Sequence, residues 1–329
     1  MRRRVWRSVV LALITVAAIP VPASAARPCP DFILGNGPTL HPEGVAYDHR
    51  NDRFLVGSVT HGTVSTVQPD GSARTLVNDP KLITTMGIAV DRGTVLAVNG
   101  DIGRGDRSTP DTINKTAGLG FYDLRSGRQI RYVDLGALDP QRAHFGNDVA
   151  VAPDGTAYVT DSRSGAIYRV PTYGSPSILV HDDRLMPAGS GNGANGIVWH
   201  PSGFLLVAHS SGRSLWRIPL RDPANLAQVT VNEPIGALDG LLLTGANTLD
   251  GIDNTSANRL LRLNSKDGWR TATVSSTKAW PDPAPTTMAR SRCGTYVLTG
   301  RLDLLLSGTK SDEFRLRRLD YSTKASDQG

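Results

Sequence analysis

Four oxygen-bearing side chains recur at the same position relative to short apolar runs of the chain. Glu43, Asn147, Asn195 and Asp239 each come just before such a run. The six aligned segments are Glu43-Gly44-Val45-Ala46, Met86-Gly87-Ile88-Ala89, Asn147-Asp148-Val149-Ala150, Asn195-Gly196-Ile197-Val198, Asp239-Gly240-Leu241-Leu242 and Thr286-Thr287-Met288-Ala289. A fold that repeats one strand start aims one side chain per repeat at a common centre. Two carboxylates and two amide carbonyls gathered there predict a site for a divalent cation, with Ca²⁺ first and Zn²⁺ as the alternative.

These four residues also suggest a division of roles. Glu43 is predicted to be a charge-balancing ligand, and Asn147 and Asn195 to be ligands that also orient an oxyanion. Asp239 is the candidate general base; if it is instead a ligand, its pKa falls and a water activated by the cation attacks directly. The absence of Cys and His at this position of the repeat argues against a thiolate or imidazole site. Each residue taken alone also fits an ordinary strand-entry turn.

Other side chains are expected around the same pocket. Phe145 and His144 precede Asn147 in the chain and are predicted to contact substrate, with His144 as a second candidate base. Asp161 and His209 end the second strands of their repeats and are predicted to line the pocket on the same face. The alternative interpretation of His144, Asp161 and His209 is that of solvated turn residues.

The elements that must position these residues are short strands joined by tight turns. The six strand starts recur at intervals of roughly 43 to 61 residues, which suits a propeller blade of four strands. Within a unit, an apolar strand is followed by an Asp-Gly or Ser-Gly turn and alternating strands, as at 149–170. The sequence therefore predicts an all-β fold: a six-bladed β-propeller of four-stranded antiparallel blades. The fifth unit is the weakest match, because 247–251 lacks the usual apolar second strand.

One long insertion and the two ends of the propeller carry further expectations. Residues 99–117 are loop-like and are predicted to hang over the face that holds the four oxygen residues, as a lid or as a plain surface excursion. An N-terminal strand near 31–34 is expected to pair with the last blade. Cys29 and Cys293, the two cysteines of the chain, would then form a disulfide across that seam, two buried thiols being the alternative.

The first 25 residues predict export. A basic stretch, an apolar run from Val9 to Val21 and Ala23-Ser24-Ala25 have the form of a secretory signal peptide cleaved after Ala25. Residues 26–329 are then predicted to form one propeller domain that is secreted and monomeric, without a membrane span. The formal net charge of +6 includes four arginines of the leader, so nucleic acid is not an expected partner.

The motifs resemble those of the senescence marker protein, gluconolactonase and luciferin-regenerating-enzyme-like family. His41-Pro42-Glu43-Gly44-Val45 is similar to its opening metal-glutamate motif, and Gly146-Asn147-Asp148 to its central asparagine segment. Asn195-Gly196-Ile197 and Leu238-Asp239-Gly240 are similar to the two remaining ligand motifs. The resemblance implies a six-bladed propeller with one divalent cation in the channel mouth, and hydrolysis of lactones or esters. Sugar-lactone members carry arginine where this chain has Phe145, which favours a less polar substrate.

Together these observations predict a secreted, metal-dependent hydrolase of lactones or related esters that acts on a small molecule. One alternative is a non-catalytic secreted propeller that binds a peptide or an envelope partner and whose metal is structural. Another is a propeller of the strictosidine-synthase-like kind, which shares the architecture and performs different chemistry.

Overall fold

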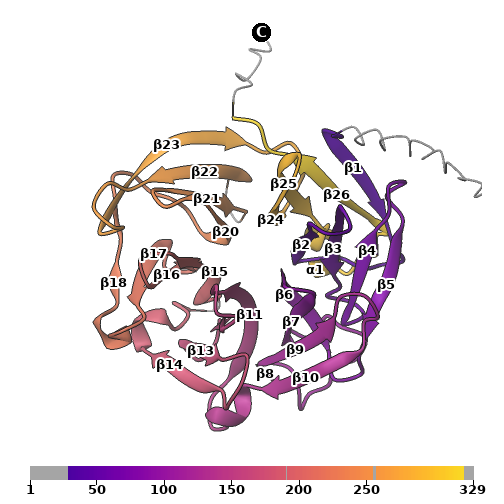
Figure 1. Ribbon diagram of the computed structural model, residues 1–329, viewed down its shortest axis with the longest axis horizontal. Coiled ribbons are helices and arrows are strands. Elements are labelled where there is room, and N and C mark those ends of the chain that lie inside the picture. The colour runs from indigo at the N-terminus through magenta and orange to yellow at the C-terminus, as the bar shows by residue number, and fades with distance from the viewer. Residues whose placement is uncertain (1–28, 190, 255–256, 322–329) are drawn as a thin grey trace, which may run out of the picture.

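Six β-sheets surround a central axis like the blades of a propeller (Figure 1). The computed structural model describes residues 29–189, 191–254 and 257–321. The predicted signal peptide lies outside these residues. The all-β, six-bladed prediction is confirmed.

Each sheet runs outward from an inner strand beside the axis. Blade 1 contains β2 (Val45–Asp48), β3 (Arg53–Gly57), β4 (Thr63–Val67) and β5 (Ala73–Asn78). Blade 2 contains β6 (Thr84–Asp91), β7 (Thr94–Gly100), β9 (Gly118–Asp123) and β10 (Gln129–Asp134). Blade 3 contains β11 (His144–Val151), β12 (Ala157–Asp161), β13 (Ala166–Val170) and β14 (Ser177–His181).

The second half of the ring repeats this order. Blade 4 contains β15 (Ala194–His200), β16 (Phe204–His209), β17 (Ser214–Pro219) and β18 (Ala227–Gln228). Blade 5 contains β20 (Leu238–Gly245), β21 (Thr248–Asp253), β22 (Arg259–Asn264) and β23 (Thr271–Ala279). Blade 6 contains β24 (Pro285–Ser291), β25 (Gly294–Thr299), β26 (Glu313–Arg318) and β1 (Phe32–Asn36).

Two blades carry a short fifth strand, which the prediction of four strands per blade did not include. β8 (Lys115–Thr116) comes from the long insertion of blade 2 and pairs parallel with β11 of blade 3. β19 (Thr230–Val231) pairs parallel with β23 at the outer edge of blade 5. Single-turn helices occupy connections: η1 (Gly136–Leu138), η2 (Asp183–Leu185), η3 (Pro223–Asn225) and α1 (Leu302–Leu306). In the described residues no helix is long and apolar enough to cross a membrane.

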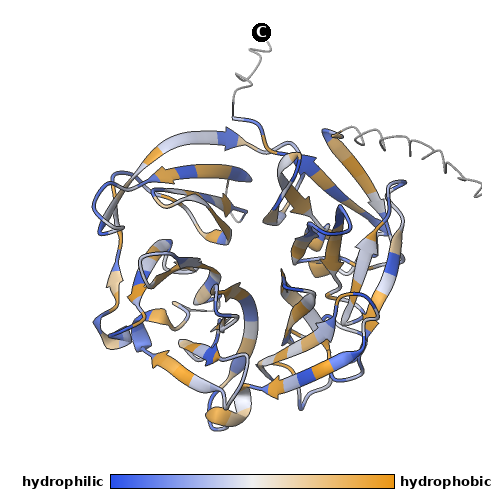
Figure 2. Cartoon of the chain, in the orientation of Figure 1, coloured by the Kyte–Doolittle hydropathy of each residue, from blue (hydrophilic) through white to orange (hydrophobic). Residues whose placement is uncertain are grey.

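The hydrophobic core lies between neighbouring blades. Val64 and Val77 of blade 1 pack with Ile88 and Val95 of blade 2, and corresponding clusters fill the other interfaces. Figure 2 accordingly shows hydrophobic residues distributed over the strands of all six sheets. Because each blade buries one face against each neighbour, no blade has a complete core of its own.

The fifth blade forms a full sheet despite its polar second strand. Asp250 of β21 is fully buried, at a point where other blades have an apolar residue. Its two carboxylate oxygens accept from Nε and Nη2 of Arg262 on β22, both at 2.8 Å. A bidentate ion pair thus satisfies the charge that made this strand hard to recognise in the sequence.

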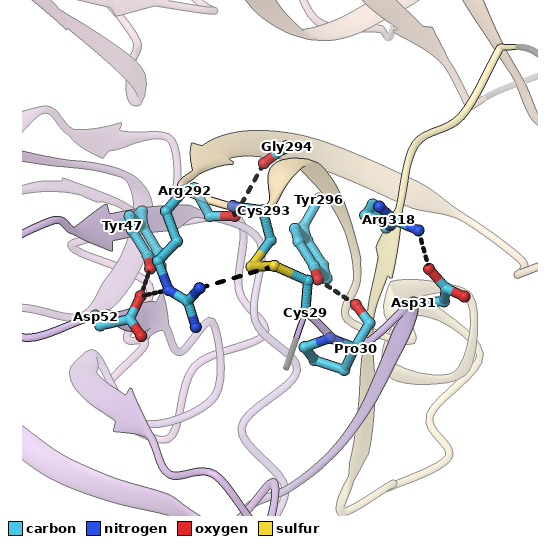
Figure 3. Close-up of a disulfide and its surroundings, with 11 residues drawn as sticks. Cys29, Pro30, Asp31, Tyr47, Asp52, Arg292, Cys293, Gly294, Tyr296 and Arg318 are labelled. Carbon is cyan, nitrogen blue, oxygen red and sulfur yellow. Dashed lines mark hydrogen bonds and ion pairs between the residues drawn. A yellow bond between two sulfur atoms is a disulfide. The ribbon is translucent and has the colours of Figure 1, made fainter. Parts of the chain in front are cut away.

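The ring closes between the first and last strands, as predicted. β1 pairs antiparallel with β26, so the N-terminal strand forms the outer edge of the last blade. Cys29 and Cys293 form a disulfide at this seam, where Tyr296 donates to Pro30 O and Arg318 pairs with Asp31 (Figure 3). The predicted disulfide is confirmed.

Candidate functional site

A recurring β-bulge aims the first residues of the inner strands at the axis. Pairing between inner and second strands is interrupted between Thr85 and Ile88 in blade 2, and the same interruption recurs in blades 3 to 6. The two residues inside each interruption include Asn147, Asn195 and Asp239. Bulges re-aim side chains and terminate pairing, and they are frequent beside active sites. The repeated phase seen in the sequence is therefore a repeated bulge.

Glycine follows Glu43, Asn195 and Asp239 because the starts of neighbouring inner strands touch. A Cβ on Gly44 would lie 2.2 Å from Met86 O of the next blade, and a Cβ on Gly196 would lie 2.1 Å from Asp239 O. Both distances are far below any real Cβ contact, so these positions accept only glycine. The glycine of the Glu-Gly and Asn-Gly pairs is thus required by packing between blades, independently of the role of the residue before it.

The four predicted residues lie together in one pocket. Glu43, Asn147, Asn195 and Asp239 all line a cavity of about 630 Å³ at the axis. At the two remaining bulges, Met86 lines the same cavity and Thr286 donates from Oγ1 to Glu43 O at 2.7 Å. A second cavity, of about 650 Å³, lies at the seam beside Cys293 and contains none of the four.

Serine hydroxyls fix the orientation of the two asparagine amides. Asn147 Nδ2 donates to Ser162 Oγ at 2.9 Å, and Ser162 Oγ donates onward to Ala194 O at 2.6 Å. Asn195 Nδ2 donates to Ser210 Oγ at 2.8 Å, and Ser210 Oγ donates to Leu238 O at 2.7 Å. Because each serine uses its only proton on a carbonyl, it must accept from the amide nitrogen. The amide nitrogens are therefore turned toward serine.

The carbonyl oxygen of Asn147 is left without a partner. Oδ1 is buried and accepts no hydrogen bond within the described residues. An unsatisfied buried acceptor costs about 1 to 3 kcal/mol, and native proteins rarely keep one without a reason. Since this oxygen is an acceptor, it suits a cation better than it suits the oxyanion predicted from the sequence, which needs N–H donors.

Three carboxyl groups near the axis are held in unfavourable electrostatic surroundings. Burial and the charges of Asp239 and Asp148 raise the pKa of Glu43 well above its usual value. Burial raises the pKa of Asp239 to about 7, helped by the charge of Asp148 and opposed by hydrogen bonds from Asn195 and Asn254. Burial likewise raises the pKa of Asp148 to about 6. A positive charge among these groups would relieve all three.

Asp148 and Asn254 belong to this site and were not among the predicted residues. Asp148 Oδ1 accepts from Val149 N at 2.8 Å, and its Oδ2 accepts from Ile197 N of the next blade at 3.1 Å. It stands where three of the other four bulges have glycine, and this doublet was the available signal. Asn254 lines the pocket and donates from Nδ2 to Asp239 Oδ2; it lies at the end of a strand that the sequence did not reveal.

The residues present fit a hard cation that uses both carboxylate and amide oxygens. In the part of the chain that the structure describes, no three His, Cys, Asp or Glu side chains lie close enough together to hold a metal ion. A cation here would therefore depend on Asn147 and Asn195 together with Glu43 and Asp239. Ca²⁺ accepts such mixed oxygen sets. Their role as ligands stays a prediction.

The insertion and α1 form part of the pocket wall, and Phe145 lines it as predicted. Ile102 and Arg104 of the insertion face the cavity, as do Leu302, Leu305 and Leu306 of α1. Arg104 Nη2 donates to Leu306 O at 3.3 Å, so the two segments meet. The expectation that 99–117 reaches over this face is confirmed; the contribution of α1 was not predicted.

The other three predicted substrate contacts do not line the cavity. His144 Nδ1 donates to Asp161 Oδ2 at 2.7 Å and its Nε2 donates to Asp139 O at 2.8 Å, so both ring nitrogens are used inside blade 3. His209 donates from Nε2 to Met186 O and accepts at Nδ1 from Gly212 N, both at 2.8 Å. None of the three lines the cavity, and all three are buried rather than solvated. Their hydrogen bonds hold loops in place.

Comparisons with known proteins agree with this architecture. Among solved structures, the Malassezia sympodialis allergen Mala s 1 has a TM-score of 0.72 at 19% identity, over 91% of this chain and 99% of that one. A luciferin-regenerating enzyme has a TM-score of 0.60 at 14% identity, over 90% and 98%. A Xanthomonas campestris gluconolactonase has a TM-score of 0.58 at 16% identity, over 87% and 89%. At these identities the likeness shows the fold alone.

No individual curated protein gives a significant match to the chain. The family model described as the SMP-30/gluconolactonase/LRE-like region matches residues 41–249. This match covers more than half of the chain and includes Glu43, Asn147, Asn195 and Asp239. The protein therefore belongs to the SMP-30/gluconolactonase/LRE-like family.

Proposed function

We propose that the protein is an exported, cation-dependent hydrolase of lactones or related esters. The observation that carries this proposal is the unpartnered Oδ1 of Asn147, held by Ser162 beside carboxyl groups of raised pKa. A site that leaves an acceptor unpaired among carboxylates is organised for a cation. Family membership supports lactone hydrolysis, since gluconolactonase is one of the activities for which the family is named. The disulfide supports an oxidising compartment.

Glu43, Asn147, Asn195 and Asp239 would hold the cation. When bound, a divalent cation polarises a carbonyl oxygen and makes water more acidic. Asn254 donates to Asp239 Oδ2 and so fixes that carboxylate against the cavity. Asp239 then either ligates or accepts the proton of the attacking water; its interactions are compatible with both roles.

Apolar groups around these oxygens control water access. Val59, Met86 and Phe145 line the cavity and belong to one buried cluster. Excluding water strengthens every charge interaction at the reacting carbonyl. Phe145 also fits the expectation of a substrate less polar than an aldonolactone.

The test is cation binding together with hydrolysis. Protein treated with chelator would be titrated with Ca²⁺ and Zn²⁺ by calorimetry, and a panel of lactones and aryl esters would be assayed before and after cation is restored. We expect one bound cation and turnover that depends on it. Glu43→Gln should weaken both, whereas Glu233→Gln, at an exposed position, should change neither.

Absence of cation binding by the wild type would refute the cation site. Cation binding without turnover on any lactone or ester would instead indicate the non-catalytic propeller. Turnover that survives complete chelation would show that the hydrolysis does not use these oxygens as proposed.

A further inference from the structure

The cavity has two unlike walls above the oxygen-bearing floor. One wall is apolar and consists of Ile102 of the insertion and Leu302, Leu305 and Leu306 of α1. The opposite side carries Arg163 and Arg213 with Asn192 and Ser211. A ligand that fills both sides must itself be amphipathic.

The apolar wall continues from the core to the mouth of the cavity. Leu302 and Leu305 pack against the cluster that contains Met86 and Phe145. Leu306 extends this surface outward and is 54% exposed. A single exposed leucine needs no explanation, but this one is continuous with a buried apolar wall inside a cavity. Arg104, which donates to Leu306 O, joins α1 to the insertion and keeps the wall together.

Arg163 is a fixed cation held by neutral partners. Its Nε donates to Asn114 Oδ1 at 3.0 Å, and its Nη1 donates to Gly191 O at 2.6 Å and Asn192 Oδ1 at 3.1 Å. The guanidinium lies 6.0 Å from the ring centre of Phe145. Among the described residues, no carboxylate forms an ion pair with it. Asp161, the nearby acid, is bound to His144 instead.

A half-buried guanidinium without an anionic partner suits an anionic ligand. Burial disfavours its charge and lowers the pKa of Arg163. Nη2 of Arg163 makes no hydrogen bond within the described part of the chain. This edge of the guanidinium therefore remains available to a ligand in the cavity. Arginine forks bind carboxylate, sulfonate and phosphate groups with charge-assisted hydrogen bonds.

We propose that the natural substrates are amphipathic anions: lactones or esters whose apolar chain lies along Leu305, Leu306 and Ile102 and whose anionic group binds Arg163. The reacting carbonyl then lies between these walls, over Asn147 and Asp239. This inference rests on the proposed function for the reaction, but the binding preference does not depend on turnover.

Non-hydrolysable probes test the preference directly. Octanesulfonate carries both a chain and an anion, ethanesulfonate only the anion, and octanol only the chain. Calorimetry with Ca²⁺ present should show octanesulfonate binding at least about tenfold more tightly than either of the others, because burial of each methylene and a charge-assisted bond each contribute. Repeating the titration after chelation separates binding at Arg163 from binding to a cation.

Matched variants locate the two contacts. Leu306→Gln should weaken octanesulfonate about fivefold, from the apolar area lost, and leave ethanesulfonate unchanged. Leu138→Gln, at a leucine 38% exposed in η1 outside the cavity, is its control. Arg163→Gln should weaken both sulfonates about tenfold or more and leave octanol unchanged. Arg131→Gln is the control, since Arg131 also donates to two backbone carbonyls and lies 5.7 Å from a phenylalanine ring.

Equal affinities for octanesulfonate and ethanesulfonate would overturn the apolar contact, and equal affinities for octanesulfonate and octanol would overturn the anionic one. An Arg163→Gln variant that binds sulfonates as the Arg131→Gln variant does would also refute the proposal. Failure of hydrolysis with the binding preference intact would contradict only the proposed function. Cation-dependent turnover that prefers short, uncharged lactones would contradict only this inference.

Discussion

Blade 3 holds two carboxylates in opposite situations, a fully buried one on Asp161 and a partly buried one on Asp148. Asp161 accepts from the backbone N–H groups of Phe145, Arg163 and Ser164 at 2.9, 3.0 and 3.2 Å, and it also binds His144 and Tyr168. Although burial opposes its charge, these hydrogen bonds, led by that of His144, lower the pKa of Asp161. Asp148 receives two backbone N–H groups, and burial prevails, so its pKa rises to about 6.

The difference separates a structural acid from a functional one. The carboxylate of Asp161 meets enough donors to be stable as an anion, and it leaves nothing for a ligand. At the wall of the open cavity, burial and the charges of Asp239 and Asp148 instead raise the pKa of Glu43, and burial and the charge of Asp148 raise the pKa of Asp239. Perturbed acids that face a cavity mark functional sites more often than those enclosed in networks do. Asp-to-Asn substitutions in the two regions should therefore have opposite consequences.

The largest expected effect is on activity. Asp239→Asn should lower kcat/KM for hydrolysis about 10³-fold, whether Asp239 is a base or a ligand. The same variant, free of cation, should unfold at the same denaturant concentration as the wild type or a higher one, because a repulsive charge is removed. Loss of folding in Asp239→Asn would show that this carboxylate is structural like Asp161.

The matching substitution in the satisfied network should act on stability. Asp161→Asn should lower the free energy of unfolding by about 2 kcal/mol, since an ion pair with His144 is replaced by neutral hydrogen bonds. Urea unfolding followed by fluorescence measures this. Per molecule of folded protein, hydrolysis should stay within about twofold of the wild type, because Asp161 lies outside the cavity. A large loss of kcat with full stability would place Asp161 in the reaction.

The next effect is on how stability depends on pH. A raised carboxyl pKa in the folded state means that the folded protein holds the proton more tightly than the unfolded one does. The associated loss of stability develops as pH rises from about 4 through about 6 for Asp148. In cation-free protein, Asp148→Asn should therefore gain several degrees of Tm relative to the wild type between pH 4.5 and pH 7.5.

Saturating Ca²⁺ should abolish that relative gain, because the cation then compensates the charge of Asp148. For Asp161, the dependence of stability on pH has the opposite sign. Its lowered pKa contributes stability that is lost as pH falls through the pKa of the folded state. The Tm difference between Asp161→Asn and wild type should accordingly narrow on acidification. If Tm depended on pH in the same way in Asp148→Asn and in the wild type, Asp148 would not belong with Glu43 and Asp239 to the carboxyl groups near the axis.

The smallest effect is expected for the hydroxyl of Ser162, which binds neither the cation nor the substrate in the proposed mechanism. Ser162→Ala removes the acceptor for Asn147 Nδ2 and should cost about 1 kcal/mol of stability. Because the amide is then free to turn, cation affinity should fall about tenfold. Ser164→Ala, which loses a hydroxyl that accepts from Ala166 N in the same blade, should leave cation affinity unchanged. Equal cation affinities in the two variants would mean that the amide orientation is set by something else.

Sequence reasoning recovered the phase of the strands and therefore Glu43, Asn147, Asn195 and Asp239, because the bulge of blades 2 to 6 and the matching strand start of blade 1 leave a repeated signature. It missed Ser162 and Ser210, although each directly follows the second strand of its blade, because a serine at a strand end is typical of an ordinary turn. It missed Asp148 because the second position of the bulge is glycine in blades 2, 4 and 5 and so carries no repeated functional side chain.

Two further differences have physical reasons. His144, Asp161 and His209 stand at strand ends on the expected face, but their polar atoms find partners within their own blades and loops. α1 has only five residues, too few for a helical period, so its leucines did not indicate a pocket wall. Position along a strand was predictable, whereas the competition of side chains for partners was not.

The pairing of β1 with β26 also has a consequence for the order in which the molecule can be made. The first strand pairs with β26, which follows every other described strand in the chain, and the two cysteines at this seam are 264 positions apart. Until that final strand arrives, the first strand has an unpaired edge and the sixth blade has no outer strand. The ring therefore closes only after the strands of every other blade have been made.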